Sequence, residues 1–374
     1  MSVGTVIIKT TSTCNLACKY CYATNRTGRV DPSSRMSFGT LNELIRQFSQ
    51  CLVSQIHFIW HGGEPLLAGL DFYQHVVDLQ RRYIRSGVSI VNSIQTNAVL
   101  ITPKWIDFFI QNRFGVGISL DGPSTIHDAM RPYASGRGSF SRIAKSIDYL
   151  RSAGITVNTL AVVTRNSLPF ASQIFDFFVG SGIKAFDLQP YVDVCRISGQ
   201  TSIDAISPQE YGVFMIEIYD KWMRYNEPDI SIRFLHNSLI GILGGTPSLC
   251  SFNGHCADHL AVDTNGDVYH CDWFFGERDK CFGNIDREDI QDILTKREYH
   301  EYVAELSQLN RECQVCEWKP ICNGGCSYLR SNSGSFQSPY YFCEARKLVF
   351  SHIKQHAIRV GGSITQGRTV TANL

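Results

Sequence analysis

The fold of this chain is decided by one stretch near its start, Thr13-Cys14-Asn15-Leu16-Ala17-Cys18-Lys19-Tyr20-Cys21-Tyr22. Three cysteines at a C-x3-C-x2-C spacing follow a short apolar segment, Thr5–Ile8. A loop of this length can wrap three thiolates around one face of an iron–sulfur cube. Because a closed cubic cluster takes four cysteines, three would leave one iron with an open position for chemistry. A zinc site and three buried structural thiols are the alternatives for this loop.

Composition and charge are those of an ordinary globular protein. The chain has 374 residues, which is enough for a large core and more than one domain. Its net charge of +1, from 35 basic and 34 acidic residues, creates no strong field that would attract nucleic acid or a membrane. We find no run of basic residues, no apolar stretch near the ~18 residues of a membrane span, and no signal-peptide pattern. We therefore predict a cytoplasmic protein without nucleic-acid or membrane partners.

The fourteen cysteines are distributed unevenly. Three lie within residues 14–21, Cys51 and Cys195 stand alone, and nine fall between Cys250 and Cys343. In a reducing compartment such cysteines serve as metal ligands or catalytic thiols more often than as disulfides. The distribution predicts two separate metal-binding regions with a cysteine-poor middle.

Strand-like and helix-like segments alternate from residue 4 to about residue 190. The predicted strands are Thr5–Lys9, Gln55–Trp60, Val88–Gln95, Gly115–Leu120, Thr156–Val163 and Ala185–Gln189. The predicted helices are Phe38–Gln50, Asp71–Arg85, Pro103–Gln111, Phe140–Ala153 and Leu168–Val179. This alternation predicts an α/β fold with a parallel sheet, either open or a partial barrel, and helices on its outer face. Catalytic groups are then expected at the C-terminal ends of the strands.

A second motif, His61-Gly62-Gly63-Glu64-Pro65, follows the second predicted strand, so it should meet the cysteine loop at the same edge of the sheet. Paired glycines allow a backbone to approach a ligand closely, and a carboxylate such as Glu64 can bind an ammonium group. In isolation G-G-E-P is a turn as often as a site. Behind C-x3-C-x2-C it becomes a strong signal, and the two motifs together resemble the radical SAM superfamily.

That resemblance implies a partial (β/α)6 TIM-type barrel that binds S-adenosylmethionine beside a 4Fe–4S cluster. The cluster would be held by Cys14, Cys18 and Cys21. The expected cofactor contacts are Tyr20, Gly62, Gly63, Glu64, Pro65, Gln95, Ser119 and Arg131. The guanidinium of Arg131 suits a carboxylate by bidentate pairing, and its alternative is a solvent-exposed loop arginine.

The C-terminal cysteines form a longer and more specific pattern. Eight of them, at 250, 256, 271, 313, 316, 322, 326 and 343, are enough for two clusters of four or for two tetrahedral zinc sites. Their layout resembles the SPASM extension found behind certain radical SAM domains. That resemblance implies an interleaved assignment to two auxiliary 4Fe–4S clusters. One set would be Cys250, Cys256, Cys271 and Cys326, and the other Cys313, Cys316, Cys322 and Cys343.

These motifs predict four segments. They are a barrel over residues 1–205, a helical linker over 206–249, a SPASM domain over 250–345, and a C-terminal helix with a polar tail over 346–374. Ser207-Pro208-Gln209-Glu210 at the start of the linker is a capping box with proline at the first helical position. Of the remaining cysteines, Cys51 is expected to be a small buried side chain and Cys195 to pack in a loop. Cys281 receives no role.

Over nearly its whole length the chain resembles the anaerobic sulfatase-maturing enzymes. This resemblance implies that a 5′-deoxyadenosyl radical abstracts hydrogen from a substrate carbon, often Cβ, in a peptide or protein. It also implies that Asp272, directly after Cys271, serves as the base; an ordinary turn or capping aspartate is the alternative. The expected reductant is a protein of the flavodoxin or ferredoxin type.

Two reactions compete within this class, and His61 bears on the choice as a second catalytic candidate. Sulfatase maturases, which make formylglycine from Cys or Ser, carry Gln before G-G-E-P, where it lines the substrate pocket. The run Trp60–Gly69 more closely resembles maturases that crosslink ribosomally made peptides. Because the first strand begins by residue 5, any leader peptide is expected to bind the barrel or SPASM surface. We favour peptide maturation slightly. A non-catalytic iron–sulfur electron carrier is a third hypothesis, which the G-G-E-P loop and the large barrel disfavour.

Overall fold

A computed structural model describes residues 4–22, 34–192, 202–254, 256–331 and 334–365. The chain divides into two compact units. The first comprises Met1–Leu120, His127–Val157 and Ala257–Leu306, and the second comprises Asp121–Ile126, Asn158–Cys256 and Ser307–Leu374. Residues 257–306 of the predicted SPASM domain thus belong to the first unit. The four predicted segments are not tested by this division and remain a prediction.

The first unit is built on a mixed sheet whose strand order is β10-β9-β8-β1-β2-β3-β4. Its parallel strands are β1 (Thr5–Lys9), β2 (Gln55–His61), β3 (Ser89–Thr96) and β4 (Phe114–Ser119), joined on the other side of β1 by β8 (His259–Val262), β9 (Asp267–Tyr269) and β10 (Gly283–Asn284). Ile8 of β1 lies opposite both Trp60 of β2 and Val262 of β8. The predicted α/β class is confirmed, and strands from the cysteine-rich region extend the sheet.

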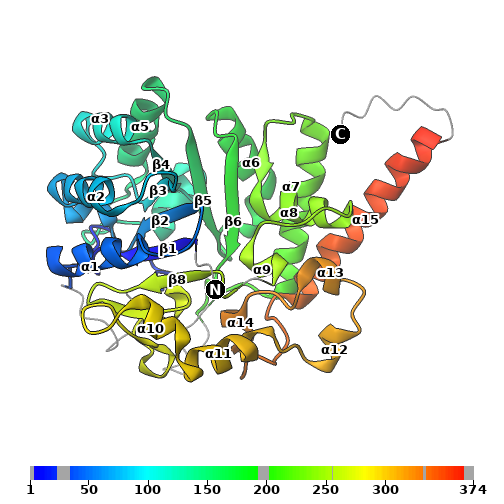
Figure 1. The fold of residues 1–374 in the computed structure, drawn as a ribbon. Coiled ribbons are helices and arrows are strands. Elements are labelled where there is room, and N and C mark those ends of the chain that lie inside the picture. Colours follow the sequence, from blue (N-terminus) through cyan, green and yellow to red (C-terminus); the bar gives the residue numbers. More distant parts are fainter. Residues whose placement is uncertain (1–3, 23–33, 193–201, 255, 332–333, 366–374) are drawn as a thin grey trace. The chain divides into compact units, whose positions relative to one another are not determined.

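One face of this sheet packs against helices, and the other carries half-buried side chains, among them the polar residues His61, Gln95 and Ser119. Along β2 the residues Ile56, Phe58 and Trp60 are buried, and they alternate with half-buried residues, as the period of two requires. The buried face is covered by α1 (Phe38–Phe48), α2 (Leu70–Tyr83), α3 (Pro103–Asn112) and α5 (Phe140–Ser152), which lie on the same side of β1–β4 in Figure 1. The ring of Trp60 lies 5.8 Å from that of Tyr73. The opposite face therefore remains for the polar residues of the predicted site.

Helix starts follow local sequence signals. Ser37 caps α1 by accepting a hydrogen bond from the amide of Thr40, and α3 begins with Pro103 at its first position, as predicted. The segment before Arg131, for which we predicted no element, forms α4 (Ser124–Met130). Arg131 therefore follows a short helix directly.

The second unit contains β5 (Val157–Val163), β6 (Ala185–Pro190) and β7 (Ser231–Ile232), which pair in parallel. Its long helices are α6 (Ala171–Gly180), α7 (Pro208–Tyr225), α8 (Arg233–Ile242) and α15 (Cys343–Thr365). The predicted capping box of Ser207 and Glu210 opens α7. Helix α15 packs along α7, where Tyr219 Oη lies 2.7 Å from His356 Nδ1. This packing fixes the start of α15, which carries a predicted cluster ligand.

The rest of the described chain consists of short elements that position loops. They are the helices α9 (Cys250–Asn253), α10 (Ile290–Thr295), α11 (Arg297–Ser307), α12 (Arg311–Gln314), α13 (Lys319–Cys322) and α14 (Ser327–Ser331), with 3-10 turns at Pro65–Ala68, Leu168–Phe170, Asp272–Phe274 and Arg278–Lys280. Within the described ranges, none of the helices combines the length and the apolar composition that crossing a bilayer requires.

Candidate active site

The G-G-E-P motif holds the segment that leads into the cysteine loop. The amide of Gly63 donates to the carbonyl oxygen of Thr11 at 2.7 Å, and that of Glu64 donates to Thr13 at 2.8 Å. A Cβ atom on Gly63 would overlap the carbonyl of Thr13, and Gly62 has a φ of +143°. The absence of a Cβ at these glycines therefore lets the chain's own backbone pack against them, and contact of Gly62 and Gly63 with a cofactor remains a prediction.

Glu64 is completely buried and ties the end of β2 to the end of β3. Its carboxylate accepts hydrogen bonds from Thr96 Oγ1 at 2.6 Å, from the amide of Asn97 at 2.8 Å and from the amide of Leu66 at 3.0 Å. Burial raises the pKa of Glu64 to about 7, and these bonds oppose the rise. They occupy three of the carboxylate's roughly four acceptor positions. Its first role in the structure is thus to hold the two strand ends together.

The predicted cluster ligands Cys14, Cys18 and Cys21 lie on one half-buried loop. The sulfur of Cys14 accepts from the amide of Leu16 at 3.5 Å and from Asn97 Nδ2 at 3.8 Å. Burial, together with the charges of Glu64 and Cys21, raises the pKa of the Cys14 thiol to about 11, and the hydrogen bonds from Leu16 and Asn97 oppose the rise. Neutral N–H groups therefore point at a buried sulfur, which is how proteins stabilise a ligating thiolate.

Arg131 and Tyr20 pack together behind the cysteine loop. The amide of Lys19 donates to the carbonyl of Met130 at 2.9 Å, which brings the end of α4 against the loop. Arg131 is only 6% exposed, and its guanidinium carbon lies 5.1 Å from the centre of the Tyr20 ring. The solvent-exposed alternative for Arg131 is therefore wrong. Contact of either residue with a cofactor remains a prediction.

Gln95 and Ser119 lie near one another at the C-terminal ends of β3 and β4. Gln95 Nε2 donates to Ser119 Oγ at 3.3 Å, and both side chains are half-buried. Gly117, opposite Gln95 in the strand register, leaves room for the Gln95 side chain because a Cβ there would overlap its amide oxygen. The structure thus brings two predicted cofactor contacts together on the polar face of the sheet.

Asp272 meets the far end of the cysteine loop. The hydroxyl of Tyr22 donates to Asp272 Oδ2 at 3.0 Å, and the Cys271 thiol donates to Oδ1 at 3.4 Å. The Tyr22 ring also lies 4.8 Å from the ring of Trp273 and 6.4 Å from that of His61. Asp272 is half-buried at the first position of a 3-10 turn. A carboxylate from the cysteine-rich region is thereby placed beside the residue that follows Cys21.

Two imidazoles also interact with this carboxylate. Burial lowers the pKa of His61; the charge of Asp272 opposes that shift, and the charge of Lys9 adds to it. Burial likewise lowers the pKa of His259, again against the effect of Asp272. Lys9 forms a buried ion pair with Asp263 at 3.4 Å. Both imidazoles are therefore held neutral near pH 7, and the structure unites the two predicted catalytic residues, His61 and Asp272.

Sequence reasoning missed three members of this group: Tyr22, Trp273 and His259. Tyr22 directly follows Cys21 and Trp273 directly follows Asp272, so adjacency to a motif was the one signal available for them. His259 carried no such signal, because β8 is placed beside β1 only by the folded sheet.

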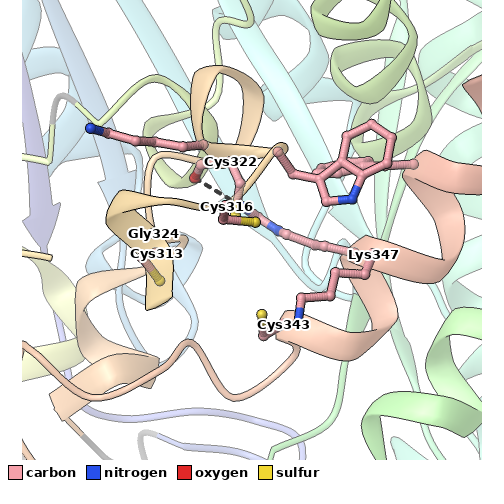
Figure 2. Close-up of a pocket in the computed structure, with 10 residues that line it drawn as sticks. Cys313, Cys316, Cys322, Gly324, Cys343 and Lys347 are labelled. Atoms are coloured by element: carbon pink, nitrogen blue, oxygen red, sulfur yellow. Dashed lines mark hydrogen bonds between the residues drawn. The ribbon is translucent and has the colours of Figure 1, made fainter. Parts of the chain in front are cut away.

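In the second unit, one pocket gathers the four cysteines assigned to the second auxiliary cluster. Figure 2 shows Cys313, Cys316, Cys322 and Cys343 around it. The backbone turns sharply after Cys322 because Asn323, Gly324 and Gly325 have φ angles of 45°, 78° and 72°. Among the described residues, no three His, Cys, Asp or Glu side chains converge closely enough to hold a single ion. Ligands of a four-iron cube lie farther apart, because each binds a different iron.

The other predicted set is only partly tested by the structure. Cys250, Cys256 and Cys326 lie near enough to one another to interact electrostatically, and the Cys256 sulfur is 3.0 Å from Ser327 Oγ. The fourth member, Cys271, belongs to the first unit, so its place in this set remains a prediction.

The cysteines outside these sets include a buried core residue. Cys51 is 4% exposed and accepts a hydrogen bond from Gln291 at 3.6 Å, which confirms that it is a buried side chain. Cys281 donates to the carbonyl of Gly283 at 3.3 Å. Cys195 lies outside the described residues.

Two arginines are buried beside the cysteines of the second unit. Arg330 is 3% exposed; burial lowers its pKa, and the thiols of Cys256 and Cys326 are the largest opposing influences. Arg346 is 2% exposed and donates to the sulfur of Cys322 at 3.2 Å. Both were missed at the sequence level, although Arg346 follows Cys343 by three residues and so shares its helix face.

Comparisons with known proteins agree with these sites. A family model of the radical SAM superfamily matches residues 8–167, and one of the iron–sulfur cluster-binding SPASM domain matches residues 250–317. The cysteine-type anaerobic sulfatase-maturating enzyme of Clostridium perfringens (strain 13 / Type A) is 30% identical over 96% of this chain and 98% of its own. The serine-type enzyme of Bacteroides thetaiotaomicron is 30% identical over 91% of this chain and 86% of its own.

Solved structures show the same similarity. Native anSMEcpe with bound AdoMet and Cp18Cys peptide superposes with a TM-score of 0.87 at 28% identity. The match covers 96% of this chain and 98% of that one. The similarity therefore extends over both units of the chain.

Proposed function

Because this chain belongs to the radical SAM superfamily and carries a SPASM domain, we propose that it oxidises the Cβ of a Cys or Ser residue in a peptide or protein to an aldehyde, giving formylglycine. Its similarity to both cysteine-type and serine-type sulfatase-maturating enzymes supports this reaction. The observation that carries it is the hydrogen bond from Tyr22 to Asp272, which puts a half-buried carboxylate at the end of the cysteine loop.

The residues of the first unit fit the cofactors that this family uses. Cys14, Cys18 and Cys21 would hold a 4Fe–4S cluster, and the amide donors around the Cys14 sulfur suit a ligating thiolate. S-adenosylmethionine would lie against the polar sheet face. Its contacts would be Tyr20, Gly62, Gly63, Glu64, Pro65, Gln95, Ser119 and Arg131. A protein of the flavodoxin or ferredoxin type would supply the reducing electron.

The second unit fits a further anionic cluster, bound by Cys313, Cys316, Cys322 and Cys343. Together with the cluster of the first unit and the one assigned to Cys250, Cys256, Cys271 and Cys326, the chain would hold three clusters. Four cysteines surround one pocket, and α15 begins at one of them, Cys343, so the positive end of that helix lies at the site. The buried guanidinium of Arg346 donates to the sulfur of Cys322. A group of thiolates and iron carries the negative charge that these features compensate.

The chain's own part in the oxidation is to remove a proton. Converting a CH2–SH or CH2–OH group into a CH=S or CH=O group removes two protons and two electrons from the substrate. When bound, the cofactors supply a radical that takes one hydrogen atom and an acceptor for the remaining electron. The remaining proton goes to Asp272, which the Tyr22 hydroxyl orients. A C=S product then exchanges sulfur for oxygen with water, releasing hydrogen sulfide.

His61 orients the substrate in this scheme. Because burial lowers its pKa, its imidazole is neutral and can exchange one hydrogen bond with the substrate's thiol or hydroxyl. The ring of Tyr22 lies 4.8 Å from that of Trp273 and 6.4 Å from that of His61, so an aromatic side chain connects the imidazole to the carboxylate that Tyr22 orients.

Peptide crosslinking is the second candidate, favoured by His61 at the position where sulfatase maturases carry Gln. The comparisons lend it no specific support. Like formylglycine formation, crosslinking begins with removal of a hydrogen from Cβ. It then forms a bond to another side chain and leaves no aldehyde.

The two reactions are separated by one experiment. The anaerobically reconstituted chain is incubated with S-adenosylmethionine, dithionite and a sulfatase-derived peptide with a central Cys or Ser, and the peptide is then treated with a hydroxylamine probe. We expect a probe-reactive peptide together with 5′-deoxyadenosine. A modified peptide that does not react with the probe would favour crosslinking. Failure to form 5′-deoxyadenosine with any peptide would contradict both reactions.

A further inference from the structure

Arg346 lies in the first turn of α15, beside the pocket of Cys313, Cys316, Cys322 and Cys343. The next residue, Lys347, also lines this pocket and is visible near Cys343 in Figure 2. The two cations differ in their surroundings. Arg346 is 2% exposed, whereas Lys347 is exposed to solvent and pairs with Glu344 at 2.9 Å.

The guanidinium of Arg346 is held rigidly. Its Nη1 donates to the sulfur of Cys322 at 3.2 Å and to the carbonyl of Ser251 at 2.8 Å, and its Nη2 donates to Ser251 Oγ at 3.1 Å. The guanidinium carbon lies 4.1 Å from the centre of the Phe252 ring and 4.6 Å from that of the Tyr340 ring, within the range of cation–π contacts. These contacts fix the charge and exclude water from it.

This arrangement is costly unless a negative charge lies in the pocket. A buried cation needs compensation, and the N-terminal turn of a helix is itself positive, which disfavours a cation there. The strongest favourable electrostatic neighbour of Arg346 is the Cys322 thiol. In addition, Arg346 Nε is buried with no hydrogen-bond partner among the described residues. The site is therefore balanced when the cysteines are present as ligating thiolates.

We propose that Arg346, acting through Cys322, raises the reduction potential of the cluster bound by Cys313, Cys316, Cys322 and Cys343. This inference rests on the proposed assignment of these four cysteines to one cluster. Reduction adds one negative charge to the cluster. A fixed positive charge in dry surroundings, and an N–H group directed at a ligand sulfur, both stabilise the reduced form more than the oxidised form. The cluster is thus the better electron acceptor with Arg346 in place.

The test compares Arg346→Gln with the matched variant Lys347→Gln in the full reconstituted chain. Each removes one positive charge at adjacent positions, one buried and one in solvent. Redox titration followed by electron paramagnetic resonance should show one midpoint lowered in Arg346→Gln, with its reduction equilibrium reduced at least tenfold, or about 59 mV for one electron. Lys347→Gln should change it by less than about threefold, because water screens an exposed charge.

Metal content separates a failure of the cluster assignment from a failure of the role proposed for Arg346. Wild-type chain that holds zinc, or too little iron for three clusters, would contradict the cluster assignment itself. Full iron content with equal midpoints in Arg346→Gln and Lys347→Gln would overturn the role of Arg346 alone. If Arg346→Gln loses iron, Arg346→Met provides the test, since it also removes the charge but leaves no unpaired polar group in the buried site. A lowered midpoint in Arg346→Met would support the inference, and an unchanged midpoint would overturn it.

Discussion

The two cysteine regions of the molecule hold their sulfur atoms in different electrostatic surroundings. In the first unit the donors to Cys14 are neutral amides, those of Leu16 and Asn97. In the second unit a donor to Cys322 is the guanidinium of Arg346. The first region offers three cysteines, so a four-iron cluster bound there would keep one coordination position open, whereas the second gathers four cysteines around one pocket. The difference suggests that the first region is built to accept a reactant, and the second to hold charge.

The proposed division of roles between the two regions is tested most directly by exchanging one cysteine for alanine in each region. We expect Cys18→Ala to reduce 5′-deoxyadenosine formation to the level of a protein-free control, because the open cluster needs all three ligands. We expect Cys316→Ala to retain it while losing aldehyde product. Iron content and chromatography of the nucleoside are the measurements. Equal loss of 5′-deoxyadenosine in both variants would refute the division of roles.

Asp272→Asn tests whether proton removal is separate from radical formation. Asparagine keeps the shape and can still accept a hydrogen bond from Tyr22, but it cannot take the proton. Product formation should fall about 10²- to 10⁴-fold while 5′-deoxyadenosine still forms. Asp279→Asn, whose side chain is 76% exposed on a nearby turn, is the control and should behave as wild type. Undiminished product from Asp272→Asn would remove Asp272 from the mechanism.

Glu64 makes the free energy of unfolding depend on pH, since burial raises the pKa of its carboxyl group from 4.5 to about 7. A carboxyl group with a raised pKa in the folded state stabilises the fold fully below pH 4.5 and loses that contribution as the pH rises through 7. Relative to Glu64→Gln, the cofactor-free wild-type chain should therefore lose about 3 kcal/mol of unfolding free energy between these pH values. Denaturant titrations of both chains measure this difference. Parallel pH profiles would contradict it.

Tyr22→Phe tests whether the hydrogen bond from the cysteine loop orients Asp272. The phenylalanine ring keeps the packing on Trp273 but loses the hydrogen bond to the carboxylate. A hydrogen bond to a charged group is worth about 1.5–3 kcal/mol, so product formation should fall at least about tenfold. The same variant should cleave S-adenosylmethionine normally. An unchanged rate of aldehyde formation would show that the bond does not orient Asp272 during the reaction.

Local signals were sufficient to predict the six strands up to Pro190 and the long helices between them to within a few residues. The apolar run Thr5–Lys9 gave β1 with its observed bounds, and Pro103 and the capping box of Ser207 marked the starts of two helices. Such signals act within a few residues of backbone, so they are present in the sequence itself.

Pairings between distant segments could not be predicted in this way. The parallel pairing of β8 with β1 and the bond between Tyr22 and Asp272 join residues about 250 positions apart. The packing of Thr11 and Thr13 against the glycines of G-G-E-P was also not predictable, because nothing in the sequence shows that these segments meet. Arg346 was predictable in principle, because its spacing from Cys343 places both on one helix face.

The central claim is that a radical generated at the Cys14–Cys21 loop takes hydrogen from the Cβ of a substrate Cys or Ser. The most direct test supplies the wild-type chain with a peptide deuterated at that Cβ and analyses the nucleoside product by mass spectrometry. The account predicts one deuterium in 5′-deoxyadenosine for each aldehyde formed. Aldehyde product accompanied by unlabelled 5′-deoxyadenosine would contradict it.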